Sequence, residues 1–433
     1  MTSAQRFVIV GAGLAGAKLA QELRGNDFDG HLTLIGAEER LPYERPPLSK
    51  EYLAGKKTLD EFTVADAAWY RDHNVELLLG TEVTAVDRGA RTVTLPDGST
   101  LPYDKMALAT GAASRSLPVP GADAPGVYTL RTVEESDALV ELFGTARRLV
   151  VIGAGWIGLE VTAAARAAGV AVTVVEGTSA PLLGALGPEM GEVFADLHRA
   201  HGVEFRFDAR VEQITVSGGR AQGVRLADGT TFEADAVLVA VGARPRIELA
   251  EAAGLLTGTG VLVDAGLTSS DPNIVAIGDI AEQEHPVLGR RIRVEHWANA
   301  LNQPAAAART MLGKAAPYDR LPYFFTDQYD LGMEYTGFAT PGDYERVVVR
   351  GNLGGREFVA FWLDDRRRVL AGMNVNVWDV GDLIKELILS GANVSTSAPL
   401  LLRPKPIPPV SEEPYPSTTV ACGSSSSSSC RCT

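Results

Sequence analysis

A glycine-rich motif occurs twice in this chain, and its two copies start 142 residues apart. The sequence GAGLAG occupies residues 11–16 and GAGWIG occupies residues 153–158; each follows four apolar residues and opens a predicted helix, 17–23 and 159–168. In such a motif the first glycine permits a tight turn, the second lets the backbone approach a pyrophosphate, and the third lets the helix pack on the strand. The helix N-terminus then presents free N–H groups to the phosphates. Two copies predict two bound dinucleotides, and the simplest pair is a flavin beside a nicotinamide.

Length and charge limit the possible partners. A sequence of 433 residues is too long to fold around a single hydrophobic core, so we expect two or three domains. A net charge of −14 argues against nucleic acid, because phosphate binding needs a basic face. No apolar run approaches the roughly 18 residues that span a bilayer, and the first 20 residues lack the basic segment of a signal peptide. We therefore expect a cytoplasmic protein with no nucleic-acid or membrane partner.

The three cysteines, Cys422, Cys430 and Cys432, all lie in the last dozen residues. The rest of the chain therefore has no redox cysteine pair, which suits a reducing compartment. Without such a pair, electrons must leave a bound flavin directly. Residues 404–433 hold six prolines and a run of six serines, and this composition predicts disorder.

The two halves follow one plan, which indicates an internal repeat. Each half has a first strand, the glycine loop and its helix, a second strand, a small meander, and a buried strand that ends in glycine. These closing strands are residues 104–111 and 236–242. A later strand, residues 271–279, ends in Gly-Asp and is expected to return the chain to the first half. From residue 321 further strands and a helix predict a third, α+β domain.

The chain resembles the FAD-dependent NADH:ferredoxin reductases of bacterial multicomponent oxygenases, which belong to the pyridine nucleotide–disulfide oxidoreductase superfamily but lack its redox disulfide. The resemblance covers about residues 5–403. Its most specific segment is PYERPPLSK at residues 42–50, supported by the Ala-Thr-Gly turn at 109–111, Gly-Asp at 278–279 and Val-Glu-His-Trp at 294–297.

The resemblance implies an α/β fold with two Rossmann-like domains of glutathione-reductase type, one for FAD and one for NAD, and a C-terminal α+β domain. We place the FAD-binding domain at residues 1–112 and 245–320 and the NAD-binding domain at 113–244. The C-terminal domain then covers residues 321–403, followed by the disordered tail at 404–433.

The FAD contacts implied by the resemblance come from several parts of the chain. Asp279 is expected to bind the ribityl chain, although an aspartate there also suits a helix N-cap. The second strand of the first unit ends at Gly36 without an acid, so the ribose contact is expected at the Ala37 backbone or at Glu38. In several relatives a tryptophan stands where this chain has Phe325. The full set is Gly11, Gly13, Leu14, Ala15, Gly16, Ala37, Glu38, Arg45, Lys50, Val83, Ala109, Thr110, Gly111, Arg131, Gly278, Asp279, Glu295, His296, Trp297 and Phe325.

The NAD contacts centre on the second motif. Glu176 ends a strand 18 residues after Gly158, where a carboxylate binds the adenosine ribose and repels a 2′-phosphate; NADH is therefore the expected donor. The set is Gly153, Gly155, Trp156, Ile157, Gly158, Glu160, Glu176 and Gly242.

Lys50 and Glu160 are the expected catalytic residues. The resemblance implies that they pair near the reactive edge of the flavin, where a cation stabilises the negative charge that arrives with hydride. The ordinary alternatives are a surface lysine and a first-turn glutamate that complements the helix dipole.

The resemblance implies NADH oxidation by FAD and delivery of single electrons to a small [2Fe–2S] ferredoxin that feeds an oxygenase. Ferredoxins are usually acidic, so we expect a local basic patch from among Arg290, Arg291, Arg293, Arg309 and residues 366–368. The alternatives are an NADH oxidase, a rubredoxin reductase, or an NADH-sensing interaction protein like the relatives of apoptosis-inducing factor. The oligomeric state stays open, with a monomer as the working expectation. No metal site is expected, because His198 and His201 lack a third ligand.

Overall fold

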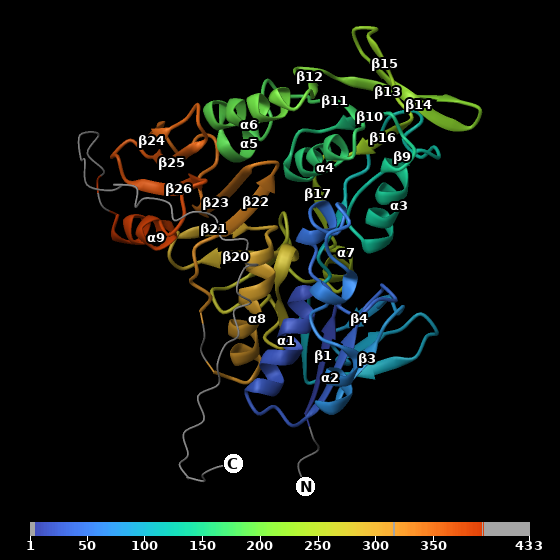
Figure 1. Cartoon of the computed structure of the whole chain (residues 1–433). Coiled ribbons are helices and arrows are strands. Elements are labelled where there is room, and N and C mark those ends of the chain that lie inside the picture. Colours follow the sequence, from blue (N-terminus) through green and yellow to red (C-terminus); the bar gives the residue numbers. More distant parts are fainter. Residues whose placement is uncertain (1–4, 315–316, 392, 394–433) are drawn as a thin grey trace, which may run out of the picture. The chain divides into compact units, whose positions relative to one another are not determined.

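The two glycine motifs lie in two five-stranded parallel sheets of the same design (Figure 1). The computed structural model describes residues 5–314, 317–391 and 393, which belong to one compact unit. The first sheet has the order β19-β7-β1-β2-β3 and the second has the matching order β9-β16-β10-β11-β12. The strands of the first are β1 (Arg6–Val10), β2 (His31–Ile35), β3 (Val75–Leu78), β7 (Lys105–Leu108) and β19 (Ile274–Ala276). Those of the second are β9 (Val127–Tyr128), β10 (Arg148–Ile152), β11 (Ala171–Val175), β12 (Glu204–Arg206) and β16 (Ala236–Val239).

Each motif strand is central and almost wholly buried, as expected of parallel strands that are covered on both faces. Each helix begins inside its motif, one residue beyond the second glycine and three residues earlier than predicted: α1 (Leu14–Gly25) and α4 (Trp156–Ala167). Strand β19 pairs with β7, so the Gly-Asp strand returns the chain to the first sheet as predicted. The internal repeat predicted from the sequence is therefore confirmed in the strand orders.

Each half contains a small antiparallel meander before its closing strand, as predicted: β4 (Ala85–Asp87), β5 (Thr92–Thr94) and β6 (Thr100–Pro102) in the first, and β13 (Val211–Ser217), β14 (Arg220–Leu226) and β15 (Thr231–Glu233) in the second. The two prolines at residues 118 and 120 and the lack of a hydrophobic period predict an irregular linker over residues 113–121. The start of this segment instead belongs to β8 (Ala112–Ser114), which pairs antiparallel with β17 (Ala243–Pro245). This two-stranded ribbon lies where the chain passes between the two halves.

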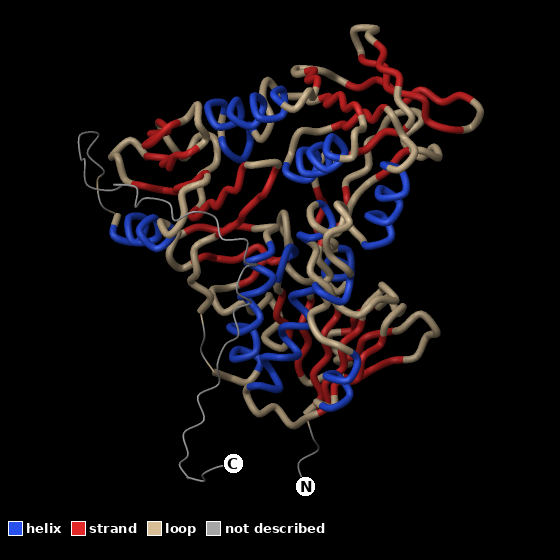
Figure 2. Tube along the Cα trace, in the orientation of Figure 1, coloured by secondary structure: helices blue, strands red, loops and turns tan. Residues whose placement is uncertain are grey.

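A five-stranded antiparallel sheet of order β22-β23-β26-β25-β24 forms the C-terminal region, with α9 against β23 and β26 (Figure 2). This arrangement matches the α+β domain that was predicted from residue 321 onward. The strands are β22 (Tyr323–Gln328), β23 (Leu331–Gly337), β24 (Arg346–Asn352), β25 (Glu357–Leu363) and β26 (Val369–Val375). The remaining elements are α2 (Ala67–Asp72), α3 (Val133–Phe143), α5 (Leu183–Leu186), α6 (Pro188–Ala200), α7 (Glu248–Ala252), β18 (Val261–Val263), β20 (Ala281–His285), β21 (Arg290–Arg293), α8 (Trp297–Met311) and α9 (Gly381–Ser390).

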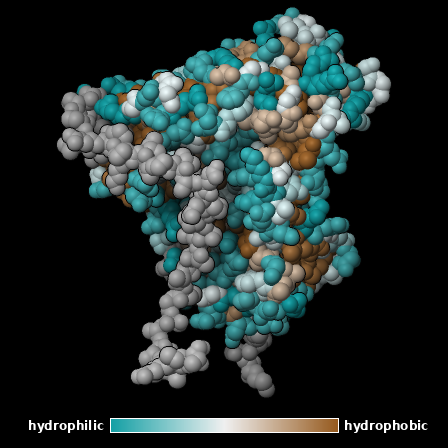
Figure 3. Space-filling view, in the orientation of Figure 1, coloured by the Kyte–Doolittle hydropathy of each residue, from teal (hydrophilic) through white to brown (hydrophobic). Residues whose placement is uncertain are grey.

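Apolar cores hold these sheets and helices together. One core packs the first sheet against α1 and α8. A second is continuous from the second parallel sheet through α6 to the C-terminal sheet, and it includes Leu238, Phe194 and Trp362. Hydrophilic residues cover most of the described surface visible in Figure 3. None of the described helices is long and apolar enough to cross a membrane. The predictions for the cysteines and for the tail at 404–433 lie outside the described residues.

Candidate functional site

A cavity of about 1230 Å³ lies where the glycine loops, the proline-rich loop and β22 come together. All residues predicted to contact FAD line this cavity except Gly16. Five of the residues predicted for NAD also line it, namely Gly155, Trp156, Ile157, Glu160 and Gly242, whereas Gly153, Gly158 and Glu176 do not. The cavity therefore brings both sets of predicted residues together, while their contacts with the cofactors stay predictions.

In the first motif, two glycines are required by the protein itself. Gly11 has φ +114°, and a Cβ there would lie 2.1 Å from the Ala109 carbonyl oxygen. A Cβ on Gly16 would lie 1.9 Å from the Gly11 carbonyl oxygen. Gly13 differs, because a Cβ there would meet nothing within 4 Å and its φ of −84° suits any residue. The space beside Gly13 is therefore left for something other than protein.

The second motif repeats this geometry. Cβ atoms on Gly153 and Gly158 would lie 2.5 Å and 2.1 Å from backbone oxygens, whereas Gly155 has open space around it. Gly153 and Gly158 are thus required by the packing of the helix and the loop. In both motifs the second glycine alone faces free space, as a pyrophosphate held on a helix N-terminus requires. The residues present thus fit two dinucleotides.

Lys50 and Glu160 form a buried ion pair at the cavity wall. The Lys50 Nζ lies 2.8 Å from Glu160 Oε1, and their side chains are only 10% and 4% exposed. Glu160 also accepts hydrogen bonds from Ser49 Oγ at 2.5 Å and from Thr326 Oγ1 at 2.6 Å. Three donors therefore compensate the charge of a carboxylate that burial would otherwise destabilise. The predicted pairing is present, and neither residue is a surface group.

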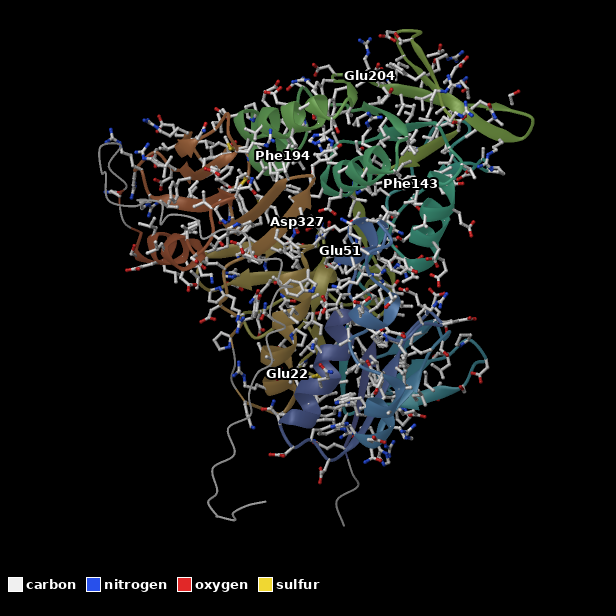
Figure 4. The ribbon with its side chains drawn as sticks, in the orientation of Figure 1. Glu22, Glu51, Phe143, Phe194, Glu204 and Asp327 are labelled. Carbon is white, nitrogen blue, oxygen red and sulfur yellow. The ribbon has the colours of Figure 1, made fainter. Side chains whose placement is uncertain are left out.

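Lys50 has a second acidic neighbour in Asp327, which Figure 4 labels beside Glu51. Burial is the main cause that raises the pKa of Asp327, and the Lys50 ammonium lowers it. The Lys50 Nζ also lies 5.4 Å from the centre of the Phe325 ring, within range of a cation–π contact. The ammonium is thus fixed between acidic groups and an aromatic face of the cavity.

Two further ionic groups line the side of the cavity predicted for FAD. Asp279 pairs with Arg131 at 2.5 Å and does not cap a helix through its side chain. The Arg131 Nε is buried without a hydrogen-bond partner, and this orphaned donor is available to a polar ligand. Glu38 binds Arg45 at 2.7 Å and accepts a 2.5 Å hydrogen bond from the Tyr43 hydroxyl, so its carboxylate is already oriented.

Aromatic residues cover another wall. The Trp297 indole N–H donates to Glu44 Oε2 at 2.7 Å, and its ring meets Phe325 edge-on with centroids 5.9 Å apart. His296 stacks on Phe324 with centroids 4.4 Å apart. Burial lowers the pKa of His296 to about 4, while Asp279 raises it less, so His296 is neutral near pH 7.

Glu176 stands at the end of β11, where it was predicted, but its carboxylate is used within the protein. It accepts hydrogen bonds from the Ala154 N–H at 2.7 Å and the Thr178 N–H at 2.8 Å. The acid therefore ties its own loop to the second glycine loop. A ribose at this position would meet an acceptor that is already held in place.

Several residues of the site were missed from the sequence. Ser49 and Thr326 hold Glu160, Phe324 and Arg246 line the cavity, and Glu44 holds Trp297. Ser49 adjoins Lys50 in the most specific motif, which is a usable signal. Thr326 gives none, because its partner lies 166 residues away in the chain.

The predicted basic patch is largely paired internally. Arg290 makes two 2.8 Å bonds to Asp343, Arg291 lies 3.5 Å from Glu284, and Arg293 pairs with Glu295. Arg368 is held by Asp364 at 2.7 Å. Of the predicted arginines in the described chain, Arg309, Arg366 and Arg367 have no such ion pair.

His198 and His201 are engaged in packing. His198 is buried beside Gln328, and His201 stacks on Tyr329 with centroids 3.6 Å apart. Among the described residues no group of three or more His, Cys, Asp or Glu could hold a metal ion.

Two equivalent glycine loops that open into one cavity beside a buried lysine define a class of oxidoreductases that bind two dinucleotides. Residues 5–304 match the pyridine nucleotide-disulphide oxidoreductase model, and residues 323–399 match the reductase C-terminal model. The chain therefore belongs to the pyridine nucleotide-disulphide oxidoreductase family, and the predicted cofactors, FAD and NAD, are those of this family.

Named relatives narrow the comparison. Rhodocoxin reductase of Rhodococcus erythropolis is 41% identical over 355 residues, which cover 82% of this chain and 83% of that protein. The ferredoxin–NAD(+) reductase component of the anthranilate 1,2-dioxygenase system of Burkholderia cepacia is 40% identical over 391 residues, covering 90% and 95%. The crystal structure of the covalent putidaredoxin reductase–putidaredoxin complex matches with a TM-score of 0.87 and 36% identity, covering 91% and 95%. The family resemblance noted in the sequence is confirmed.

Proposed function

We propose that this chain passes electrons from NADH through FAD to a small [2Fe–2S] ferredoxin that feeds an oxygenase. The observation that carries the proposal is the buried Lys50–Glu160 pair in a cavity shared by both glycine loops. No cysteine occurs among residues 1–421, so none of the described residues that line this cavity is a cysteine that could receive the electrons. The relatives named as ferredoxin reductase components support the choice of acceptor.

Bound FAD supplies hydride acceptance from NADH and release of single electrons. The residues of the chain orient the reactants and shape the electrostatics of the cavity. Gly13 and Gly155 leave room for the pyrophosphates, and Lys50 holds a positive charge where negative charge develops. Trp297 and Phe325 give one wall of the cavity an aromatic surface.

We also propose the domain division given above, supported by the two separate parallel sheets and by the return of β19 to the first. The residues predicted for FAD and NAD are proposed as their binding sites, with NADH preferred because of Glu176. A cytoplasmic location is proposed from the placement of the cysteines alone.

The test is anaerobic stopped-flow mixing of the yellow holoprotein with NADH, followed by mixing with an oxidised [2Fe–2S] ferredoxin. We expect rapid loss of flavin absorbance and then reduction of the ferredoxin. Rapid flavin reduction with transfer only to oxygen would favour the oxidase, and transfer only to rubredoxin would favour the rubredoxin reductase. Slow reduction with a persistent complex and a change in oligomeric state would favour the NADH sensor.

The acceptor surface gives a separate prediction. Arg366 and Arg367 are exposed and lack ion pairs in the described chain, so an acidic ferredoxin can engage them without breaking internal contacts. Replacing both by Glu should raise the KM for ferredoxin about tenfold at low salt and flatten its salt dependence. The control replaces Arg147 and Arg210, which are also exposed and lack ion pairs in the described chain, by Glu. Equal effects of the two double variants would assign the change to net charge rather than to docking.

A further inference from the structure

A chain of buried hydrogen bonds leads from the cavity into the protein. It starts at Glu160, which accepts from Thr326 Oγ1 at 2.6 Å, and Thr326 Oγ1 accepts from Gln328 Nε2 at 3.1 Å. The Gln328 Oε1 lies 2.8 Å from His198 Nε2, and the His198 Nδ1 lies 3.3 Å from the Tyr329 hydroxyl. Thr326, Gln328 and His198 are each at most 1% exposed.

The donor and acceptor chemistry of these groups gives the series of hydrogen bonds a single direction of donation. An amide nitrogen only donates, so Thr326 accepts from Gln328 and gives its own proton to the carboxylate. The Gln328 carbonyl oxygen then accepts from His198 Nε2–H, which leaves Nδ1 to accept from Tyr329. Burial lowers the pKa of His198 to about 4, so the ring is neutral and can donate on one side and accept on the other. Every donor therefore points toward Glu160.

The buried hydrogen bonds connect elements that are distant in the sequence. Thr326 and Gln328 belong to β22 of the C-terminal sheet, whereas His198 belongs to α6 and Glu160 to α4. Figure 4 labels Asp327, which separates the first two, and Phe194 on the same helix as His198. Aligned hydrogen bonds polarise one another in a low-dielectric interior, so the chain delivers more compensating charge to Glu160 than an isolated hydroxyl.

We propose that Thr326, Gln328 and His198 are positioning residues that act on the flavin site through Glu160 and Lys50. This inference rests on the proposed NADH-dependent reduction of FAD. While these hydrogen bonds are intact, they compensate part of the negative charge on Glu160. The carboxylate then holds the Lys50 ammonium in place without drawing it out of the cavity. Without the Thr326 hydrogen bond, only Lys50 and Ser49 compensate the buried carboxylate, so Lys50 is bound more closely to it and presents less positive charge to the cavity.

The first test replaces Thr326 by Val, which keeps its shape and removes its hydroxyl. In anaerobic stopped flow, the limiting rate of flavin reduction by NADH should fall about tenfold, because small misplacements of reacting groups are costly. The dissociation constant for NADH should change less than about twofold, since the altered charge acts on the reacting centre and not on nucleotide binding. The midpoint potential of the bound flavin should become more negative, and Thr326→Ser should restore both values.

The matched control is Thr336→Val, a buried strand threonine of the same sheet that takes no part in the chain. A second pair compares Gln328→Met with Gln283→Met, where Gln283 is a buried glutamine bonded to the carbonyls of Ala265 and Tyr318. Gln328→Met should change the rate and the potential in the same direction as Thr326→Val but by less. If Thr326→Val fails to fold, this second pair decides the question.

Wild-type rate and potential in both Thr326→Val and Gln328→Met would overturn the inference. Equal losses in the matched controls, or no rescue by Thr326→Ser, would also overturn it by assigning the effect to packing. If NADH failed to reduce the flavin of the wild type, the proposed function would fall. The midpoint potentials of the bound flavin, measured with a chemical reductant, would still test whether Thr326, Gln328 and His198 are positioning residues.

Discussion

The second glycine of each motif is the residue whose role the packing of the protein leaves unexplained. At Gly13 and Gly155 a side chain would meet no protein atom, and the backbone angles are ordinary. At Gly11, by contrast, a side chain would clash with a backbone carbonyl. Substitutions at these positions therefore separate the needs of folding from the needs of the ligand.

Gly13→Val should give protein that is folded but colourless, because the valine occupies space that the flavin pyrophosphate needs. Gly155→Val should stay yellow and bind NADH at least about tenfold more weakly. Flavin-to-protein ratio, circular dichroism and NADH titration measure these outcomes. Gly11→Val is the less informative variant, since loss of flavin there would be confounded with disruption of the loop. A fully yellow Gly13→Val protein would contradict the assignment.

Lys50 gives a second prediction at this scale, because it is buried against Glu160. Lys50→Met should lower the free energy of unfolding by about 3 kcal/mol, since it leaves a buried carboxylate without its cation. It should also slow flavin reduction about 100-fold. Adding Glu160→Gln should recover most of the stability without recovering the rate, as urea unfolding and stopped flow would show. Wild-type kinetics in Lys50→Met would remove Lys50 from the catalytic step.

At the scale of elements, β11 and the loop beyond it work as one unit through Glu176. The carboxylate accepts hydrogen bonds from the N–H groups of Ala154 and Thr178, so it fixes its own loop to the second glycine loop. A ribose that binds here, as predicted, would meet an acid whose position is set before the ligand arrives.

Glu176→Arg should raise the ratio of kcat/KM for NADPH to that for NADH by at least about tenfold, because the change removes a repulsive carboxylate and adds a phosphate partner. It should also lower kcat/KM for NADH, since the Ala154 and Thr178 N–H groups lose their acceptor. Steady-state kinetics with both nucleotides measure the effect. Glu176→Gln is the control for loss of charge alone. An unchanged preference would remove Glu176 from the ribose site.

Elements with a strong local signal could be predicted from the sequence. The β-branched strands, the glycine loops and the α+β pattern after residue 321 all appear where expected. The β8–β17 ribbon could not be predicted, because its two strands are short and pair across more than 100 residues. The same holds for Thr326 and Gln328, whose hydrogen bonds with Glu160 and His198 depend on packing between distant elements. Lys50 and Glu160 were predictable only through the family motif.

At the scale of the whole molecule, His198 links α6 to the C-terminal sheet through a buried contact. Burial lowers its pKa from 6.5 to about 4. A proton is therefore bound more tightly by the unfolded chain, so the contribution of His198 to stability is complete above pH 6.5. That contribution is lost as the pH falls from 6.5 toward 4, at about 1.4 kcal/mol per pH unit and by about 3 kcal/mol in all.

His198→Gln should remove part of the decline in unfolding free energy between pH 6.5 and 5, even if the variant is less stable at pH 7; burial lowers the pKa of His296 and His285 too, and their share of the decline should remain. Urea titrations at several pH values measure this slope. Thr336→Val, an uncharged change in the same region, should lower stability equally at each pH. A His198→Gln slope identical to that of the wild type would show that this histidine does not govern acid stability.

The β8–β17 ribbon has a mechanical consequence. The chain passes between its two nucleotide-binding halves twice, and the two crossings are bonded to each other through Ala112–Ser114 and Ala243–Pro245. The Thr110 hydroxyl and the Arg246 N–H add bonds at one end of the ribbon. A single proteolytic cut in either crossing therefore leaves the halves tethered by the intact crossing. The same redundancy makes these crossings candidate sites for circular permutation, with new termini placed in one crossing while the other preserves the link.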